Sequence, residues 1–143
     1  MGHDAVEIDF VMPWVDGSDP AWREEFLKYR ALQAPQGEPA CDTGTAAGAV
    51  DASEERYRDW DTLRYWFRGV ERFAPWVNRI HFITWGHLPA WLDTAHPKLH
   101  VVRHADYIPS PYLPTFNSCP IELNMHRIEG LAEHFVYFND DPF

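Results

Sequence analysis

The most constraining feature of the sequence is a nearly continuous apolar run near its start, residues 7–15 (EIDFVMPWV). Strands with this composition are buried on both faces, as in parallel sheets covered by helices. Residues 79–84, 99–102 and 135–138 also have strand composition. Because stretches with helical signals separate these strands, the sequence predicts an α/β domain with a mainly parallel sheet.

Two helices are predicted in the first half of the chain. Asp19 and Pro20 predict a helix start, because Asp is a favourable N-cap and Pro fits the first turn. This helix is expected to end near Arg30. Residues 61–74 have apolar side chains at helical spacing, so a second helix is predicted there, with Phe73 among its inward side chains.

The second half of the chain predicts two more helices, which complete a three-layer arrangement. A short helix is expected to begin at residues 89–92. A longer one is expected from Ser118, as N-cap, to Gly130. In a continuous helix, Glu122 and His126 would lie one turn apart. A Glu and a His one turn apart can belong to an active site, but they are also common as a solvated or mutually satisfied pair. Both interpretations stay open.

Composition excludes several classes of function. The chain has 143 residues, which suits one domain, and a formal net charge of −10. This charge argues against non-specific binding to nucleic acid or to an anionic membrane. The two cysteines, Cys41 and Cys119, lack metal-type spacing and are predicted to be free thiols. With no apolar segment of membrane-spanning length and no signal-peptide core, a cytoplasmic protein is expected.

Two segments have alternative interpretations. Residues 32–53 are rich in Ala, Gly, Pro and Thr and contain no aromatic residue, so a surface loop is predicted. A plain insertion is favoured there over a lid or an acceptor-binding loop. His96, His100 and His104 recur every four residues, but Pro97 and the strand composition argue against the helix that would gather them around zinc.

Candidate binding residues follow two of the predicted strands. Asn139, Asp140 and Asp141 come after residues 135–138, and ligands of open α/β sheets bind at the carboxyl ends of strands. Two carboxylates there suit Mg²⁺, although an ordinary turn has the same composition. Residues 14–20 join a strand to a helix N-terminus, where a nucleotide or phosphate could dock. The Gly-x-Gly-x-x-Gly pattern of a Rossmann site is absent.

Residues 8–11 (IDFV) and 14–20 (WVDGSDP) together resemble the first conserved region of the Stealth family. These proteins are capsular and exopolysaccharide phosphotransferases, related to the lysosomal N-acetylglucosamine-1-phosphotransferase. The first region would span about residues 7–30 and the second about 54–143, on either side of the variable loop. Segments that resemble the second region are residues 57–59, 63–65, 74–77, 89–92, 113–118, 121–122, 126–128 and 139–141.

The sequence also departs from the family pattern. Met12-Pro13, Trp60 and Cys119-Pro120 are local variations. The family's third and fourth regions, which supply a further His and Arg, have no counterpart in these 143 residues. A fragment of a longer protein is therefore expected.

The resemblance implies a fold and a reaction. The fold is similar to the GT-A nucleotide-sugar fold. The reaction transfers a sugar 1-phosphate from a nucleotide-diphosphate sugar, such as a UDP-hexose or UDP-N-acetylhexosamine, to a glycan hydroxyl. A conventional GT-A glycosyltransferase and a non-catalytic nucleotide-sugar-binding module are the alternatives.

The resemblance also implies roles for individual residues. Asp141, with Asp140, would hold Mg²⁺ or Mn²⁺ on the diphosphate. Glu122 would orient the acceptor hydroxyl or take its proton, and His126 would support Glu122 or contact phosphate. Trp14 would offer a stacking surface to the nucleotide. The expected substrate-binding residues are Trp14, Asp16, Gly17, Asp19, Arg64, Asn117 and Arg127.

Overall fold

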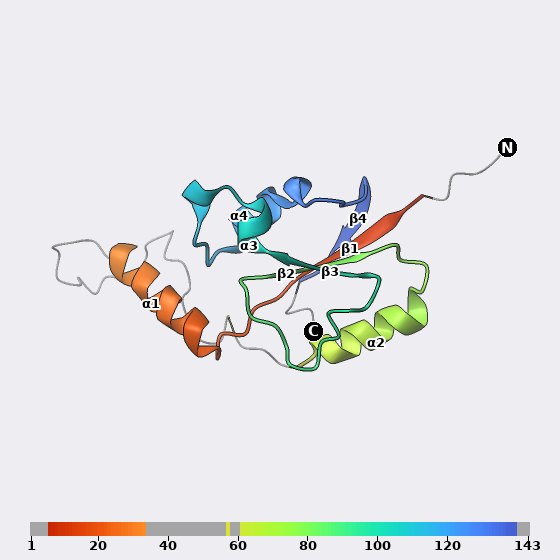
Figure 1. Ribbon diagram of the computed structural model, residues 1–143, viewed down its shortest axis with the longest axis horizontal. Helices are drawn as coiled ribbons and strands as arrows, with labels where there is room; N and C mark the ends of the chain where they lie inside the picture. The colour runs from red at the N-terminus through yellow and green to blue at the C-terminus, as the bar shows by residue number, and fades with distance from the viewer. Residues whose placement is uncertain (1–5, 34–56, 58–60, 140–143) are drawn as a thin grey trace, which may run out of the picture.

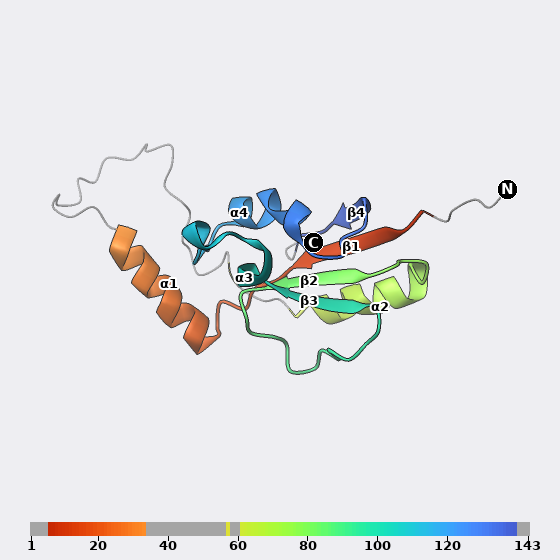
Figure 2. The same cartoon turned by 45° about the horizontal axis from the view of Figure 1, so that its top comes forward.

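The computed structural model describes residues 6–33, 57 and 61–139. These residues form a four-stranded sheet in which all neighbouring strands are parallel, in the order β3-β2-β1-β4 (Figures 1 and 2). The predicted parallel α/β fold is therefore confirmed, and no strand boundary differs from its prediction by more than two residues. The strands are β1 (Ile8–Pro13), β2 (Ile80–Thr84), β3 (Leu99–Arg103) and β4 (His134–Tyr137).

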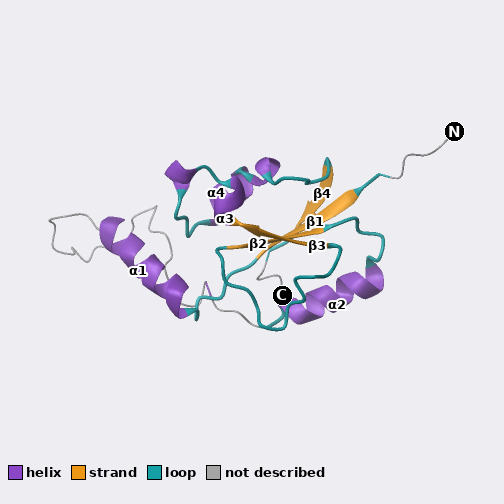
Figure 3. Ribbon diagram, in the orientation of Figure 1, coloured by secondary structure: helices purple, strands orange, loops and turns teal. Residues whose placement is uncertain are grey.

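Helical elements cover both faces of the sheet (Figures 1 and 3). Helix α2 (Leu63–Phe73) packs Leu63 and Val70 on one face. On the other face lie α3 (His104–Tyr107), α4 (Ser118–Leu123) and the 3₁₀ turn η3 (Met125–Arg127). Alternate residues of β1 face the two layers: Phe10 packs on the α2 side, and Val11 packs on the other. This is the predicted three-layer arrangement.

Helix α1 (Pro20–Gln33) lies beyond the carboxyl end of β1 (Figures 1 and 2). Its predicted N-cap is confirmed, because Asp19 Oδ1 accepts a 2.8 Å hydrogen bond from the Trp22 amide. Trp22 is buried and contacts the rings of Tyr57 and Phe116, with centroids 4.9 and 5.5 Å away. These aromatic contacts join α1 to a loop that is distant in the sequence.

The predicted continuous helix from Ser118 to Gly130 is wrong. The helix ends at Leu123, because Asn124 leaves the helical conformation and its side-chain amide donates to the Pro120 carbonyl at 2.8 Å. That carbonyl would otherwise accept the helical hydrogen bond from the Asn124 backbone. Ser118 is also not the cap: Asn117 Oδ1 accepts from the Cys119 amide. Glu122 and His126 therefore lie on separate elements.

Other predictions need smaller corrections. Residues 89–92 form a turn rather than a helix. Phe73 is 75% exposed instead of inward, because it ends α2 beyond the edge of the core. Cys119 is an exposed free thiol, as predicted, whereas Cys41 lies outside the described residues. The predicted loop over residues 32–53 also lies outside them, except for its first two residues, which end α1.

In the described part of the chain, no helix is long and apolar enough to cross a bilayer. Between α3 and α4 the chain forms the short 3₁₀ turn η2 (Ser110–Tyr112).

A buried carboxylate connects three strands near their amino ends. Asp9 of β1 is fully buried, and its Oδ1 accepts from the Asn78 side-chain amide at 2.8 Å. Its Oδ2 accepts from the Ala132 amide and from His81 Nε2, each at 2.8 Å. His81 Nδ1 lies 2.9 Å from His100 Nδ1 on β3. We call this group the Asp9 network.

The protonation states in the Asp9 network follow from burial and hydrogen bonding. Burial by itself raises the pKa of Asp9, but the bonds from Ala132, His81 and Asn78 outweigh it and hold the pKa below the usual value. Burial lowers the pKa of His81 against the opposing effect of Asp9. Near neutral pH, His81 is therefore a neutral imidazole that donates from Nε2 to Asp9 and accepts from His100 at Nδ1.

Replacing Asp9 tests how much the network stabilises the fold. Asp9→Ala leaves buried donors of His81 and Ala132 unpaired, so we expect a loss of about 2 to 5 kcal/mol in the free energy of unfolding. Urea denaturation at pH 7 measures it. The matched control is Glu24→Ala, which removes a carboxylate from an exposed ion pair with Lys28 and should leave stability close to wild type. Equal losses in both variants would contradict the assigned role.

Candidate functional site

A pocket of about 310 Å³ lies at the carboxyl ends of the strands. Because all four strands are parallel, the chain leaves each of them at this same edge. Trp14 follows β1, His104 follows β3, and Tyr137 and Asn139 end and follow β4. The full lining is Pro13, Trp14, Val15, Trp22, Tyr57, His104, Thr115, Phe116, Asn117, Ser118, Ile121, Glu122, Tyr137 and Asn139.

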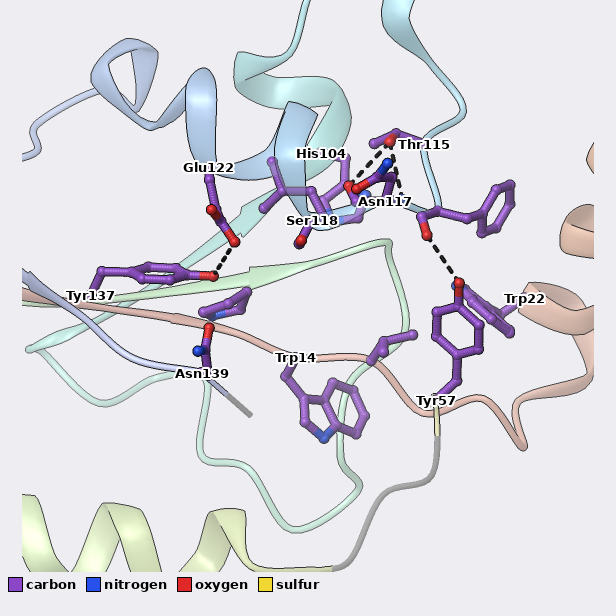
Figure 4. A pocket seen from close by; sticks show the side chains of 14 residues that line it. Trp14, Trp22, Tyr57, His104, Thr115, Asn117, Ser118, Glu122, Tyr137 and Asn139 are labelled. Atoms are coloured by element: carbon purple, nitrogen blue, oxygen red, sulfur yellow. Dashed lines mark hydrogen bonds between the residues drawn. The ribbon is translucent and has the colours of Figure 1, made fainter. Parts of the chain in front are cut away.

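Glu122 points from α4 toward β4 at one side of this pocket (Figure 4). Its Oε1 accepts a 3.1 Å hydrogen bond from the Tyr137 hydroxyl. No described residue donates a hydrogen bond to Oε2. Tyr137 therefore fixes the orientation of the carboxylate at the side of the pocket.

The turn after β1 is held by polar contacts of its own. Asp16 Oδ1 accepts from the Ser18 amide at 2.9 Å and from the Ser18 hydroxyl at 2.6 Å. Gly17 donates its amide to the Tyr57 carbonyl at 2.8 Å, and a Cβ on Gly17 would lie 2.6 Å from Tyr57. Asp16, Gly17 and Asp19 do not line the pocket, in contrast to Trp14. In this structure the three residues shape the turn and cap α1.

The predicted cationic and imidazole groups lie outside the pocket. Arg64 is exposed on α2, with Nε 3.3 Å from Asp61 and its guanidinium over the Trp91 ring at 5.2 Å. Arg127 is exposed on η3. His126 is exposed too, and its Nδ1 lies 3.0 Å from the Leu123 carbonyl rather than near Glu122. Of the predicted site residues, the structure thus brings Glu122, Trp14 and Asn117 together in the pocket and leaves Arg64, Arg127 and His126 outside it.

The predicted metal ligands Asp140 and Asp141 lie outside the described residues. Asn139, which precedes them, lines the pocket. Within residues 6–33, 57 and 61–139, no group of three or more His, Cys, Asp or Glu side chains is placed to hold a metal ion. The metal site stays a prediction from the sequence.

His104 is the main lining residue that sequence reasoning missed. Its spacing with His96 and His100 does not point to the pocket, but its position two residues after the predicted strand at 99–102 is a signal for the carboxyl edge of the sheet. The side chain is 9% exposed, and among the described residues its Nδ1 has no hydrogen-bond partner. Burial, with a smaller contribution from His87, lowers the pKa of His104 to about 4. The imidazole is therefore neutral at physiological pH.

Other lining residues that the sequence did not predict come from distant parts of the chain. Trp22, Tyr57 and Thr115 come from α1, from the segment before α2 and from the loop before α4. Tyr57 donates its hydroxyl to the Phe116 carbonyl at 3.1 Å (Figure 4). Only the tertiary fold brings these elements together, so local sequence patterns carried no signal for them.

The fold and the position of the pocket define the class of protein. A parallel α/β domain with a pocket outside the carboxyl ends of its strands has the arrangement in which open α/β sheets bind ligands. This arrangement is consistent with the predicted nucleotide-sugar-binding fold.

Comparison with known proteins gives the family. Residues 6–32 match Stealth protein CR1, conserved region 1, and residues 56–143 match Stealth protein CR2, conserved region 2. The chain therefore belongs to the Stealth family, and the resemblance stated from its motifs is confirmed.

Individual relatives in this family carry related names. The chain is 56% identical over 136 residues to the capsular polysaccharide phosphotransferase WcwK of Streptococcus pneumoniae, covering 95% of this chain and 37% of the relative. It is 47% identical over 143 residues to the receptor polysaccharide phosphotransferase WefC of Streptococcus oralis, covering 96% and 38%. For the capsular polysaccharide phosphotransferase eps5J of Streptococcus thermophilus, the identity is 48% over 139 residues, covering 95% and 52%. The chain thus spans between about a third and about half of these relatives.

Proposed function

We propose that this chain takes part in transferring a sugar 1-phosphate from a nucleotide-diphosphate sugar to a glycan hydroxyl, in the synthesis of a capsular or exopolysaccharide. The observation that carries the proposal is a Stealth-family chain with a carboxylate, Glu122, in a pocket at the carboxyl edge of its sheet. Relatives named as polysaccharide phosphotransferases support the type of reaction.

The proposed reaction breaks a phosphoanhydride bond and forms a phosphodiester. An acceptor hydroxyl oxygen attacks the β-phosphorus of a UDP-sugar and forms a new P–O bond. The bond from that phosphorus to the bridging oxygen breaks, and UMP leaves with the bonding electron pair. The hydroxyl proton passes to a base. The sugar keeps its C1–O bond, so its anomeric configuration does not change.

Glu122 is the group best placed in the pocket for the role of base. General bases in such reactions act within hydrogen-bond reach of the proton that they abstract. Tyr137 holds one carboxylate oxygen at 3.1 Å, which leaves Oε2 to accept from an acceptor hydroxyl. Phosphoryl transfer depends mainly on positioning and charge neutralisation, so a fixed carboxylate that orients the nucleophile suits it.

A divalent cation is the second element of the proposal. The described pocket lining contains no Arg or Lys, so a diphosphate bound there needs positive charge from elsewhere. Carboxylate oxygens are the donors that Mg²⁺ prefers, and Asp140 and Asp141 follow Asn139 of the pocket directly in the sequence. A cation held by these residues would offset the charge of the phosphates. Arg64 and Arg127 remain candidates for contacts with phosphate outside the pocket.

Product analysis tests the reaction type. With a UDP-sugar donor and a capsular oligosaccharide acceptor, we expect UMP and a sugar linked through a phosphodiester. UDP and a glycoside would instead indicate a conventional glycosyltransferase, which breaks the C1–O bond. Donor binding without either product, in this chain and in a longer one, would indicate a non-catalytic nucleotide-sugar-binding module. Phosphorus NMR of the product separates the first two outcomes directly.

Glu122→Gln tests the assigned base. The amide keeps the size of the side chain but cannot take a proton, so kcat for UMP release should fall by roughly 10²-fold or more. Calorimetric binding of the donor should persist. Glu129→Gln, at an exposed position outside the pocket, provides the same chemical change as a control. A near-normal kcat in Glu122→Gln would rule out this role.

Asp141→Asn tests the cation site. Loss of a carboxylate ligand should weaken the Mg²⁺- or Mn²⁺-dependent part of donor binding, measured by calorimetry with and without the metal. Asp93→Asn is the matched control, because Asp93 is exposed and away from the pocket. Metal-dependent binding that is unchanged in Asp141→Asn would remove this residue from the proposal.

A further inference from the structure

The amide of Asp16, in the turn after β1, meets a side chain where a sheet would supply a backbone carbonyl. Trp14 donates its amide to the Ile83 carbonyl at 2.9 Å, which continues the pairing of β1 with β2. Along a strand, every second amide points toward the same neighbour, so the next donor in this direction is Asp16. Its amide donates to His87 Nε2 at 2.8 Å. An imidazole beyond the end of β2 therefore takes the place of a strand carbonyl.

His87 is attached to the end of β2. Thr84, the last residue of this strand, is fully buried and donates its hydroxyl to the His87 carbonyl. The same hydroxyl accepts from the Gly86 amide at 3.2 Å. The imidazole of His87 packs on the Trp14 ring, with ring centroids 5.0 Å apart. The turn after β2 thus holds the imidazole in a fixed position against the segment that follows β1.

The contact with Asp16 defines the protonation state of His87. A backbone amide can only donate, so Nε2 must be the acceptor nitrogen, and the neutral ring has its hydrogen on Nδ1. Within the described residues Nδ1 has no hydrogen-bond partner, so the bond to Asp16 is the one hydrogen bond of the ring there. A protonated imidazole has hydrogen on both nitrogens and could not accept from Asp16.

Burial keeps this ring neutral against the effect of nearby carboxylates. It lowers the pKa of His87 below the usual value, whereas the charges of Asp19 and Asp16 act in the opposite direction. His104, after β3, is also close, because a charge on His87 would disfavour one on His104. The hydrogen bond to Asp16 is therefore present at neutral pH, and it is lost as the pH falls through the lowered pKa of His87.

We propose that His87 is a positioning residue of the site, whose neutral imidazole holds residues 14–16 in place at the wall of the pocket. Trp14, on the pocket wall (Figure 4), and Val15 directly precede the Asp16 amide that His87 binds. The inference rests on the proposed function, in which this segment contacts the nucleotide-sugar donor. His87 does not line the pocket, so it acts on donor binding through residues 14–16 and not on the reacting atoms.

Two substitutions separate the hydrogen bond from the bulk of the ring. His87→Phe keeps a ring beside Trp14 but has no acceptor, whereas His87→Gln offers an amide oxygen near the former Nε2 position and cannot titrate. In NMR spectra of the 143-residue chain, the Asp16 amide should exchange with solvent roughly 10-fold faster in His87→Phe, the scale of one hydrogen bond. His87→Gln should restore slow exchange. Equal exchange of the Asp16 amide in wild type and in a folded His87→Phe would overturn the proposal.

Donor binding connects this contact to the site. In calorimetry with UDP-glucose or UDP-N-acetylglucosamine, Mg²⁺ and about pH 7.5, Kd should rise roughly 5- to 10-fold in His87→Phe and change less than about 2-fold in His87→Gln. In the active enzyme, KM for the donor should rise in His87→Phe with kcat nearly unchanged. A wild-type Kd in a folded His87→Phe would contradict the positioning role. Binding by His87→Gln as weak as by His87→Phe would contradict it too.

His96→Phe is the matched control. The exposed His96 also accepts a backbone amide, that of Lys98 at 3.2 Å, but it does not line the strand-end pocket. The same substitution there should leave the Kd of the donor unchanged. A weakening equal to that in His87→Phe would show that the effect is not specific to residues 14–16, and would count against the proposal.

The pH dependence tests the neutral imidazole and needs no variant without an acceptor. Between about pH 7.5 and 4.5, the ratio of Kd in wild type to Kd in His87→Gln should rise, because only the wild-type ring gains a proton and releases Asp16. The other titratable groups are the same in both proteins and cancel in this ratio. A constant ratio would overturn the proposal even if His87→Phe does not fold.

These measurements separate the inference from the proposed function. If the wild-type protein binds no UDP-sugar, the proposed function fails, and exchange of the Asp16 amide across the same pH range still decides whether His87 holds the turn. If UMP release occurs but His87→Phe changes neither Asp16 exchange nor donor KM, the positioning role fails while the proposed function stands.

Discussion

The sheet contains a buried carboxylate on which its packing depends. Hydrogen bonds from neighbouring groups keep this carboxylate charged. Asp9 is fully buried on β1 and accepts hydrogen bonds from the Asn78 side chain, from His81 and from the Ala132 backbone. The second ring nitrogen of His81 forms a hydrogen bond with His100 on β3. A buried charge without such partners would destabilise the fold strongly. The network therefore constrains the register of three parallel strands at their amino ends.

The carboxyl ends of the same strands are less completely satisfied. There the chain leaves the sheet at Trp14 and His104, which line the pocket, and within the described part of the chain Trp14 Nε1 and His104 Nδ1 are buried without a hydrogen-bond partner. Other polar groups at this end are paired, among them Glu122 with Tyr137 and Asp16 with Ser18.

Charge explains why the pocket alone does not account for the proposed reaction. A nucleotide-diphosphate sugar carries negative charge on its diphosphate, and the described pocket lining contains no Arg or Lys to offset it. The chain as a whole is acidic, with a formal net charge of −10. In the proposed reaction, this positive charge would come from a bound cation or from arginines outside the pocket.

Local patterns in the sequence determined the elements of this fold. The apolar run at residues 7–15 predicted a buried parallel strand, because strands covered on both faces have such continuity. The run at residues 135–138 also predicted a strand, but β4 lies at the edge of the sheet and its Phe135 and Val136 stay exposed. Asp19 before Pro20 predicted the start of α1, because a side-chain cap acts within one turn. The motifs also predicted the Stealth family, and the resemblance implied a site role for Glu122, which lines the pocket.

Tertiary structure decided the contacts between elements, which local sequence patterns do not encode. One side-chain hydrogen bond, from Asn124 to Pro120, ends α4 and separates Glu122 from His126. The pairing of Glu122 with Tyr137 joins residues from different elements, and the burial of His104 arises where β3 meets the pocket. Sequence periodicity reports which residues share one face of one element. Contacts between elements depend on packing in three dimensions, so the composition of the pocket was decided only when the sheet and its two helical layers came together.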